Sequence, residues 1–146
     1  MASEIRVGVS LAVKGTELDF RSSPTSFNAD QALTNKGHGP GRVIATTAGK
    51  DVDLSAFTQP GVMWLQNLDS VNIVTAGVWD PVALKFYPLI ELQPGEFYVL
   101  RLSRYLKEYY GTGTGTILTD TDPDNVRLRL KSDNANVECQ VEVFES

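Results

Sequence analysis

The sequence predicts an all-β protein, built as a single antiparallel, jelly-roll-like β-sandwich with at most one short helix. Short apolar runs, many of them alternating with polar residues, recur along nearly the whole chain and are bounded by Gly, Pro, Asn, Asp and Ser. Four such runs follow one another between Gly61 and Leu102. At 146 residues, the chain suits one domain, 1–146, that is large enough to bury a core.

The N-terminal residues have the clearest strand pattern in the chain. Every odd position from Ile5 to Val13 is apolar, and the even positions form the other face, which predicts a half-buried strand. A turn at Lys14 and Gly15 leads into a second strand around Phe20. The chain is therefore expected to begin with an antiparallel hairpin.

Residues 22–41 have no sustained period and are dense in Ser, Asn, Gly and Pro, which predicts a long loop or arm. Loops of this length usually bind something or become ordered on assembly, with a plain surface loop as the alternative. If the arm is ordered, its backbone polar groups need partners, and a neighbouring subunit is an obvious source. Two short strands are expected after it, at 42–47 and 51–57.

The central block is expected to hold four strands. Residues 62–65 form an unbroken apolar run, typical of a strand covered on both faces, which would place Trp64 in the core. A β-branched strand at 71–76 follows. The third strand contains Pro88 at the parity of Leu84, Phe86 and Ile90, and it must be an edge strand or carry a bulge there, because proline cannot donate to a ladder.

Residues 93–96, Gln-Pro-Gly-Glu, predict a type I or type II turn. The twist of these turns does not suit a two-residue hairpin loop, so we expect a wider corner between two sheets. The fourth strand of the block then follows at 97–102.

The C-terminal residues predict a hairpin with a salt-bridged outer face. Apolar residues alternate over 126–130 and 137–143, and turn formers occupy 132–136. Opposite charges across strands would fix the register of this hairpin and discourage edge aggregation. The facing sets would be Arg127, Arg129 and Lys131 against Glu138, Gln140 and Glu142.

Large aromatic side chains outside the expected strands are candidate interface residues. Residues 104–110 predict a short helix with an aromatic face, capped by Ser103 and ended by Gly111. Trp79 lies in an expected loop at 78–81, and interfaces favour Trp and Tyr as anchors. Together with two apolar residues of the arm, the candidate set is Phe27, Leu33, Trp79, Tyr109 and Tyr110.

No catalytic, cofactor-binding or metal-binding site is expected. His38, the single histidine, lies among glycines without a second ligand, and we expect it to be a solvated loop residue. The aspartates at 120, 122 and 124 match the first positions of a calcium loop, but its glycine and its glutamate are replaced. Cys139 falls within a strand pattern and is expected to be buried. The sequence therefore predicts a protein that is not an enzyme.

The formal charge of −5 opposes nucleic-acid binding, which needs clustered Lys and Arg. No run approaches the roughly 18 apolar residues of a membrane span, and the N-terminus lacks the pattern of a signal peptide. We therefore expect no membrane partner and synthesis in the host cytoplasm.

Three segments between the two expected hairpins carry short motifs. The first ends a strand as G-x-x-x-L-x-N-L-D, the second contains F-Y-P-L-I-x-L-x-P-G-E, and the third is an R-L strand. The matching residues are Gly61, Leu65, Asn67, Leu68 and Asp69, then Phe86, Tyr87, Pro88, Leu89, Ile90, Leu92, Pro94, Gly95 and Glu96, then Arg101 and Leu102. Over nearly its full length the chain resembles a family of small phage virion proteins, from whose pattern residues 22–41 and 105–124 depart.

The resemblance implies a non-enzymatic virion structural protein, a capsid decoration (cement) protein that binds the outer surface of a phage head. Its partners would be further copies of itself, with three the expected number by analogy with other decoration proteins, and the major capsid protein. Two alternatives remain open. One is a head–tail or tail accessory β-sandwich, and the other is a carbohydrate-binding module that uses Trp64, Trp79 and the tyrosines as stacking platforms.

Overall fold

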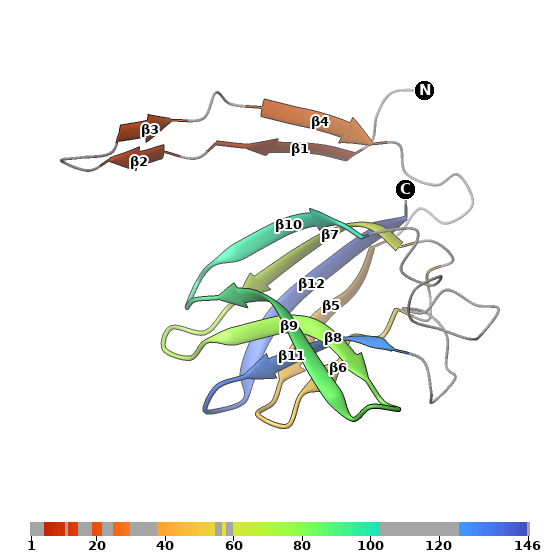
Figure 1. Cartoon of the computed structure of the whole chain (residues 1–146). Helices are drawn as coiled ribbons and strands as arrows, with labels where there is room; N and C mark the ends of the chain where they lie inside the picture. Colours follow the sequence, from red (N-terminus) through yellow and green to blue (C-terminus); the bar gives the residue numbers. More distant parts are fainter. Residues whose placement is uncertain are drawn as a thin grey trace.

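The structure is a computed structural model of the chain, and it describes residues 5–10, 12–14, 19–21, 25–29, 38–54, 57, 60–102 and 126–145. These residues form twelve strands and contain no helix. Eight strands make two four-stranded sheets, and the other four form two-stranded pairs. The predicted all-β antiparallel sandwich is confirmed (Figure 1).

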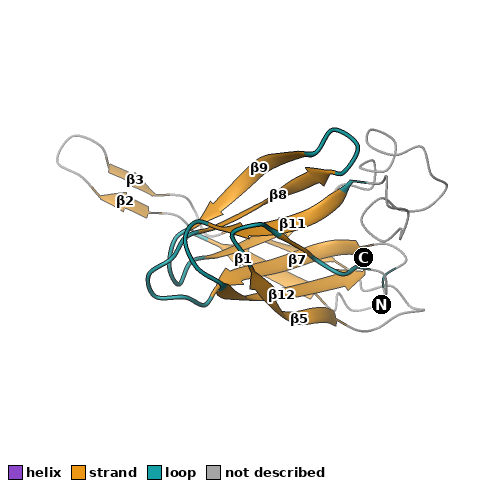
Figure 2. Ribbon diagram, turned by 90° about the horizontal axis from the view of Figure 1, so that it is seen from below, coloured by secondary structure: helices purple, strands orange, loops and turns teal. Residues whose placement is uncertain are grey.

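The two four-stranded sheets face each other as two layers (Figure 2). The arm-side sheet has the strand order β10-β7-β12-β5, and the far sheet has the order β6-β11-β8-β9. The arm-side strands are β10 (Phe97–Arg101), β7 (Pro60–Asn67), β12 (Val137–Glu145) and β5 (His38–Ala45). The far-sheet strands are β6 (Lys50–Asp51), β11 (Arg127–Ser132), β8 (Val74–Asp80) and β9 (Lys85–Leu92).

Alternating apolar side chains fill the space between the sheets. Met63 and Leu65 of β7 and Leu130 of β11 are almost completely buried, and burying each such side chain stabilises the fold by about 1.5–3 kcal/mol. Cys139 of β12 lies in the same core cluster, which confirms the prediction that it is buried.

The first four strands form an arm that lies outside the sandwich, next to the arm-side sheet (Figure 1). They are β1 (Ile5–Val9), β2 (Ala12–Lys14), β3 (Asp19–Arg21) and β4 (Thr25–Ala29). β2 pairs antiparallel with β3, and β1 pairs antiparallel with β4. The predicted N-terminal hairpin is confirmed, but it extends well beyond Phe20, as far as Ala29.

The prediction of a long loop or arm at residues 22–41 is wrong in two places. β4 lies inside this range, and β5 begins at His38, so His38 starts a strand instead of lying in a loop. β4 reads Thr-Ser-Phe-Asn-Ala and has no sustained apolar alternation. A two-stranded ribbon can be solvated on one or both faces, so its strands do not need the pattern that marks a core strand.

The predicted C-terminal hairpin is also wrong. β11 pairs with β8 and β6 in the far sheet, whereas β12 pairs with β5 and β7 in the arm-side sheet. The two strands therefore belong to opposite layers of the sandwich. Both arrangements require the same apolar alternation, because in each case the apolar faces point into one core.

The charged residues of these two strands find partners within their own sheets. Arg129 Nε lies 2.6 Å from Asp51 Oδ1 of the neighbouring β6, and Arg42 Nη1 of β5 lies 3.0 Å from Glu138 Oε1 of β12. The expected ladder of charges between β11 and β12 does not exist, because those strands are not neighbours.

Pro88 has the position that its chemistry predicts. β9 is the edge strand of the far sheet, and the ladder with β8 shifts register between Ala76 and Gly77, opposite Pro88. Leu84, which was expected to lie in this strand at the parity of Pro88, instead precedes it in a turn at φ 53° and is 74% exposed.

The turn at residues 93–96 is confirmed as a corner between sheets. The Glu96 amide donates to the Gln93 carbonyl at 3.0 Å, and Gly95 has φ 78°, as a type II turn requires. The turn joins β9 of the far sheet to β10 of the arm-side sheet.

Other boundaries differ from the predictions. β8 begins at Val74, so residues 71–73 are not strand, and it continues to Asp80, so Trp79 lies in a strand instead of a loop. In the expected strand at 51–57, Val52 and Leu54 are buried but are not part of a ladder. The predicted helix at 104–110 lies outside the described residues. Within the described part, no helix has the length and apolar character needed to cross a membrane.

Candidate functional site

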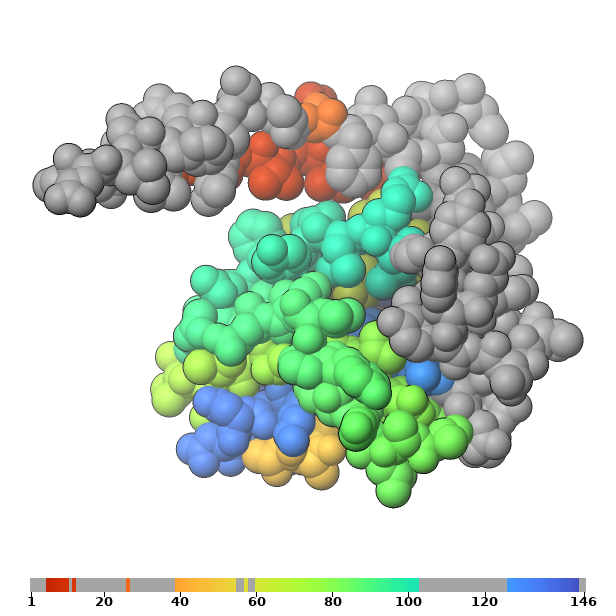
Figure 3. All heavy atoms as spheres, viewed as in Figure 1, coloured from red at the N-terminus to blue at the C-terminus, as the bar shows by residue number. Residues whose placement is uncertain are grey.

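A groove lies between the arm and the arm-side sheet. Its roof is residues 5–10, and its floor consists of Val62, Trp64, Phe97, Val99 and Phe144. We call this the arm groove. Its volume is about 630 Å³, a typical size for a binding site. Figure 3 shows the hollow between the red residues of β1 and the cyan residues of β10.

The floor exists because strands of the arm-side sheet carry apolar residues on both faces. In β7, Met63 points into the core, whereas Val62 and Trp64 line the groove. In β12, Val143 belongs to the core and Phe144 to the groove. Apolar residues on both faces are typical of a strand that is covered on both sides. Here the second cover is the arm.

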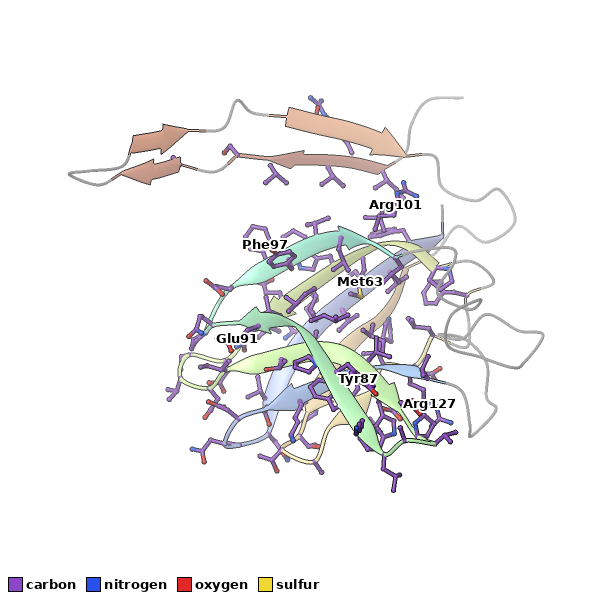
Figure 4. The ribbon with its side chains drawn as sticks, in the orientation of Figure 1. Met63, Tyr87, Glu91, Phe97, Arg101 and Arg127 are labelled. Atoms are coloured by element: carbon purple, nitrogen blue, oxygen red, sulfur yellow. The ribbon has the colours of Figure 1, made fainter. Side chains whose placement is uncertain are left out.

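The prediction that Trp64 lies in the core is wrong, because its ring is only partly buried on the groove floor. It stacks on Phe97 of β10, with ring centroids 4.6 Å apart and planes 9° apart. Trp64 is directly opposite Val99 in the register, so Phe97 is its diagonal neighbour, within the reach of two aromatic rings. Phe97 remains 55% exposed and points toward the arm (Figure 4).

The roof adds apolar surface and a single charge. Ile5 and Val7 are partly buried, whereas Val9 is 59% exposed. Arg6 is the one ionisable side chain among the described residues that line the groove. Apart from Arg6, this lining is suited to binding apolar and aromatic groups.

A second exposed apolar surface lies on the far sheet. The turn before β9 and the outward face of β9 carry four large side chains that are 46–74% exposed. We call them the β9 patch: Val82, Leu84, Tyr87 and Leu89. Figure 4 shows Tyr87 on the strand, and Figure 3 shows this turn in green at the molecular surface. The proline at position 88 correctly indicated an edge strand. Both faces of this strand are apolar in the sequence, so the sequence did not indicate which face is exposed to solvent.

The predicted interface residue Trp79 is not an open anchor. The guanidinium of Arg129 lies 4.0 Å above the Trp79 ring, and Asp51 holds the same guanidinium from β6. This cation–π contact covers one face of the indole. Trp79 lies in the far sheet and takes no part in the arm groove.

The other predicted interface residues are not brought together with Trp79 by the described part of the chain. Phe27 lies in β4, where it is the register partner of Val7. Leu33, Tyr109 and Tyr110 lie outside the described residues. The loop or arm predicted at 22–41 overlaps the arm of the structure only in β4, and the aromatic pair beneath the arm was missed from sequence.

Cys139 is the one titratable residue in the main core cluster of the described chain. Burial raises the pKa of the Cys139 thiol to about 11, so the thiol stays protonated and a poor nucleophile at neutral pH. Among the residues that the structure describes, no group of three or more His, Cys, Asp and Glu could hold a metal ion. The aspartates at 120, 122 and 124 lie outside them.

Comparison of the chain with protein-family models, with curated proteins and with solved structures finds no match. The function is therefore inferred from the fold and from its two exposed apolar surfaces, the arm groove and the β9 patch.

Proposed function

We propose that this chain is a non-enzymatic structural protein that binds protein surfaces, and that it serves as a capsid decoration protein on the outside of a phage head. The observation that carries this proposal is the β9 patch. Soluble monomers rarely gather large apolar side chains on a surface without a partner, and open edge strands are usually protected. In the proposed role, the major capsid protein covers the β9 patch.

The separation of the two apolar surfaces supports a subunit that bridges partners. The arm groove lies on the arm-side sheet, whereas the β9 patch lies on the far sheet. One chain could thus contact the capsid through one surface and another subunit through the other. The sandwich between them supplies a rigid spacer, and its formal charge of −5 disfavours the phosphate backbone of nucleic acid as the partner.

Binding to phage heads assembled without this chain tests the proposal. Replacing Leu84→Ser and Leu89→Ser together is expected to weaken the Kd for these heads at least tenfold, or about 1.4 kcal/mol, because it removes two of the four large apolar side chains of the β9 patch. Co-sedimentation over a concentration series measures the change. Val71→Ser is the matched control, since Val71 is 76% exposed but lies outside the β9 patch.

The outcomes of this experiment separate the competing roles. Equal binding by the double variant and by Val71→Ser would remove the β9 patch from the interface. Binding of the intact chain to isolated tails instead of heads would favour a head–tail or tail accessory protein. No binding to any particle would overturn the virion role. Circular dichroism and urea unfolding of each variant check that the fold is intact.

The stacked Trp64 and Phe97 rings favour a carbohydrate-binding module as the second candidate. Exposed aromatic rings in a groove are suitable platforms for sugar rings, and Phe97 is 55% exposed. Titration of the chain with a panel of oligosaccharides, followed by tryptophan fluorescence, tests this role. A saturable change that is lost in Phe97→Ser would support it over the capsid role.

A further inference from the structure

The arm is an incomplete sheet. In the described residues β1 pairs only with β4, and β2 pairs only with β3, so both outer edges of the ribbon lack a strand partner. An isolated two-stranded ribbon is marginally stable in water and gains stability when another surface covers its apolar residues. Along β1, the arm-side sheet partly provides this cover.

The end of the arm has no such cover. We call β2 and β3 the tip of the arm. Figures 1 and 2 both show the tip beyond the edge of the sandwich, where neither sheet lies beneath it. Two apolar residues of the tip, Val13 and Phe20, are register partners. The tip therefore extends away from its own groove and cannot fill it.

The arm groove is underfilled by its own chain. Val9 of the roof and Phe97 of the floor are 59% and 55% exposed, although they line the same groove. Apolar area that remains in contact with water favours a partner, because its burial is stabilising in proportion to the area removed from water. An apolar segment entering the groove would cover both side chains.

We propose that the arm groove receives the tip of the arm of a second copy of this chain. Every copy carries one projecting tip and one open groove, so the two features occur in equal number in any assembly. Two copies can exchange tips about a twofold axis, or each tip can enter the groove of the next copy, which closes into a ring when the rotation between copies allows. The proposal adds a partner for the arm groove to the proposed function, on which it rests, and leaves the β9 patch free for the particle.

A cysteine trap on the full-length chain tests this contact without any particle. One preparation carries Val13→Cys in the tip, and the other carries Phe97→Cys in the groove. A disulfide between these two positions in the mixture can form only between copies. A third preparation, Val71→Cys, places the thiol outside the groove at a more exposed position, 76% against 55% for Phe97. The native Cys139 is completely buried and does not compete.

The mixed disulfide between positions 13 and 97 is expected to exceed that between positions 13 and 71 at least tenfold, as measured on non-reducing gels. Equal yields of the two would overturn the proposal. Sedimentation of the unmodified chain is expected to show an oligomer, with at least tenfold weaker association in Phe97→Ser and no change in Val71→Ser. A monomer, or an oligomer that Phe97→Ser leaves unchanged, would overturn the contact. Failure of head binding alone would overturn only the capsid role.

Discussion

Asn67 shows how one buried polar side chain holds three parts of the sandwich together. It is 0% exposed, and its amide nitrogen lies 2.9 Å from the Asn72 carbonyl, 3.1 Å from that of Leu92 and 3.3 Å from that of Gln93. Its side-chain oxygen accepts the amide of Asp69 at 2.9 Å. The end of β7 is thereby joined to the 68–73 loop and to the end of β9.

Asp69 completes this loop. Its carboxylate accepts the backbone amides of Asn72 and Val71, both at 2.7 Å. These two donors, that of Asn72 first, lower the pKa of Asp69 below its ordinary value of 3.8. The carboxylate is therefore charged at neutral pH, which is the form that accepts these bonds.

Replacing Asn67→Ala is expected to lower the free energy of unfolding by about 2–3 kcal/mol, because buried carbonyl groups would lose their donor. Urea denaturation followed by circular dichroism measures this change. Asn134→Ala is the matched control, because Asn134 is exposed between β11 and β12, and its substitution should stay within about 0.5 kcal/mol of the native chain. A loss of the same size in both variants would contradict the role assigned to Asn67.

At the scale of the residue, the sequence indicated the turn but not its burial. The end of a strand at Asn67 and Asp69, two of the residue types that bound the apolar runs, was predicted from residue types alone. Asn67 is completely buried because β9 ends beside it. Its hydrogen bond to the Leu92 carbonyl joins residues 25 positions apart along the chain, so the burial could not be predicted from local sequence. The burial of Cys139 was predicted correctly, because an apolar alternation on both sides of the residue was enough.

Among the elements, the β8–β9 pair depends on a close approach of two backbones at the bulge. A methyl group added at Gly77 would collide with the Tyr87 carbonyl oxygen and would lie 2.9 Å from the Phe86 ring. A backbone carbonyl cannot move aside without the strand that carries it. Glycine is therefore required where the register shifts opposite Pro88.

Replacing Gly77→Ala is accordingly expected to lower the free energy of unfolding by about 1–3 kcal/mol through overpacking. Thermal and urea unfolding measure the effect. Gly39→Ala in β5 is the control, since the nearest atom to its added methyl group is 4.0 Å away, an ordinary contact. That substitution should be neutral or slightly stabilising. Equal losses at the two glycines would show that the close approach at the bulge is not what requires glycine.

The elements also show where sequence patterns stop being sufficient. The corner at residues 93–96 was predicted because a Pro-Gly turn is incompatible with the twist of a tight hairpin, which is a local property. The C-terminal hairpin was predicted wrongly because β11 and β12 have the same alternation whether they pair or face each other. Which strands pair depends on contacts between residues far apart in the sequence. Here Arg129 of β11 pairs with Asp51 of β6, and Glu138 of β12 pairs with Arg42 of β5, so β11 and β12 do not pair their charges with each other.

In the whole molecule, the sandwich and the arm contribute differently to the fold. Every buried residue of the main core cluster lies between Val43 and Val143, so the sandwich contains its own core. The described side chains of the arm contribute none of these residues, and the arm covers the outer face of one sheet instead. The groove could not be predicted from sequence, because nothing in residues 5–29 indicates which surface the ribbon lies against.

A deletion can therefore test the role of the arm only if its end point does not cut through a strand of the sandwich. Removing residues 22–41 would delete β4 together with the first half of β5, including the positions that pair with Val141, Glu142, Val143 and Phe144 of β12. That deletion would damage the sandwich and the arm at once. Removing residues 1–37 takes away the four strands of the arm and leaves β5 complete.

The shortened chain, 38–146, is expected to keep the circular dichroism of the strands and a cooperative unfolding transition, because its core cluster is intact. It should also bind the hydrophobic dye ANS more strongly than the full chain, because Val62, Trp64 and Phe144 lose their cover. Dye fluorescence at equal protein concentration measures this gain. The same truncation with Trp64→Ser and Phe97→Ser should return the fluorescence toward that of the full chain, which assigns the dye to the groove floor. An unchanged signal after truncation would mean that the arm does not shield this floor, and loss of the strand spectrum would mean that the sandwich needs the arm to fold.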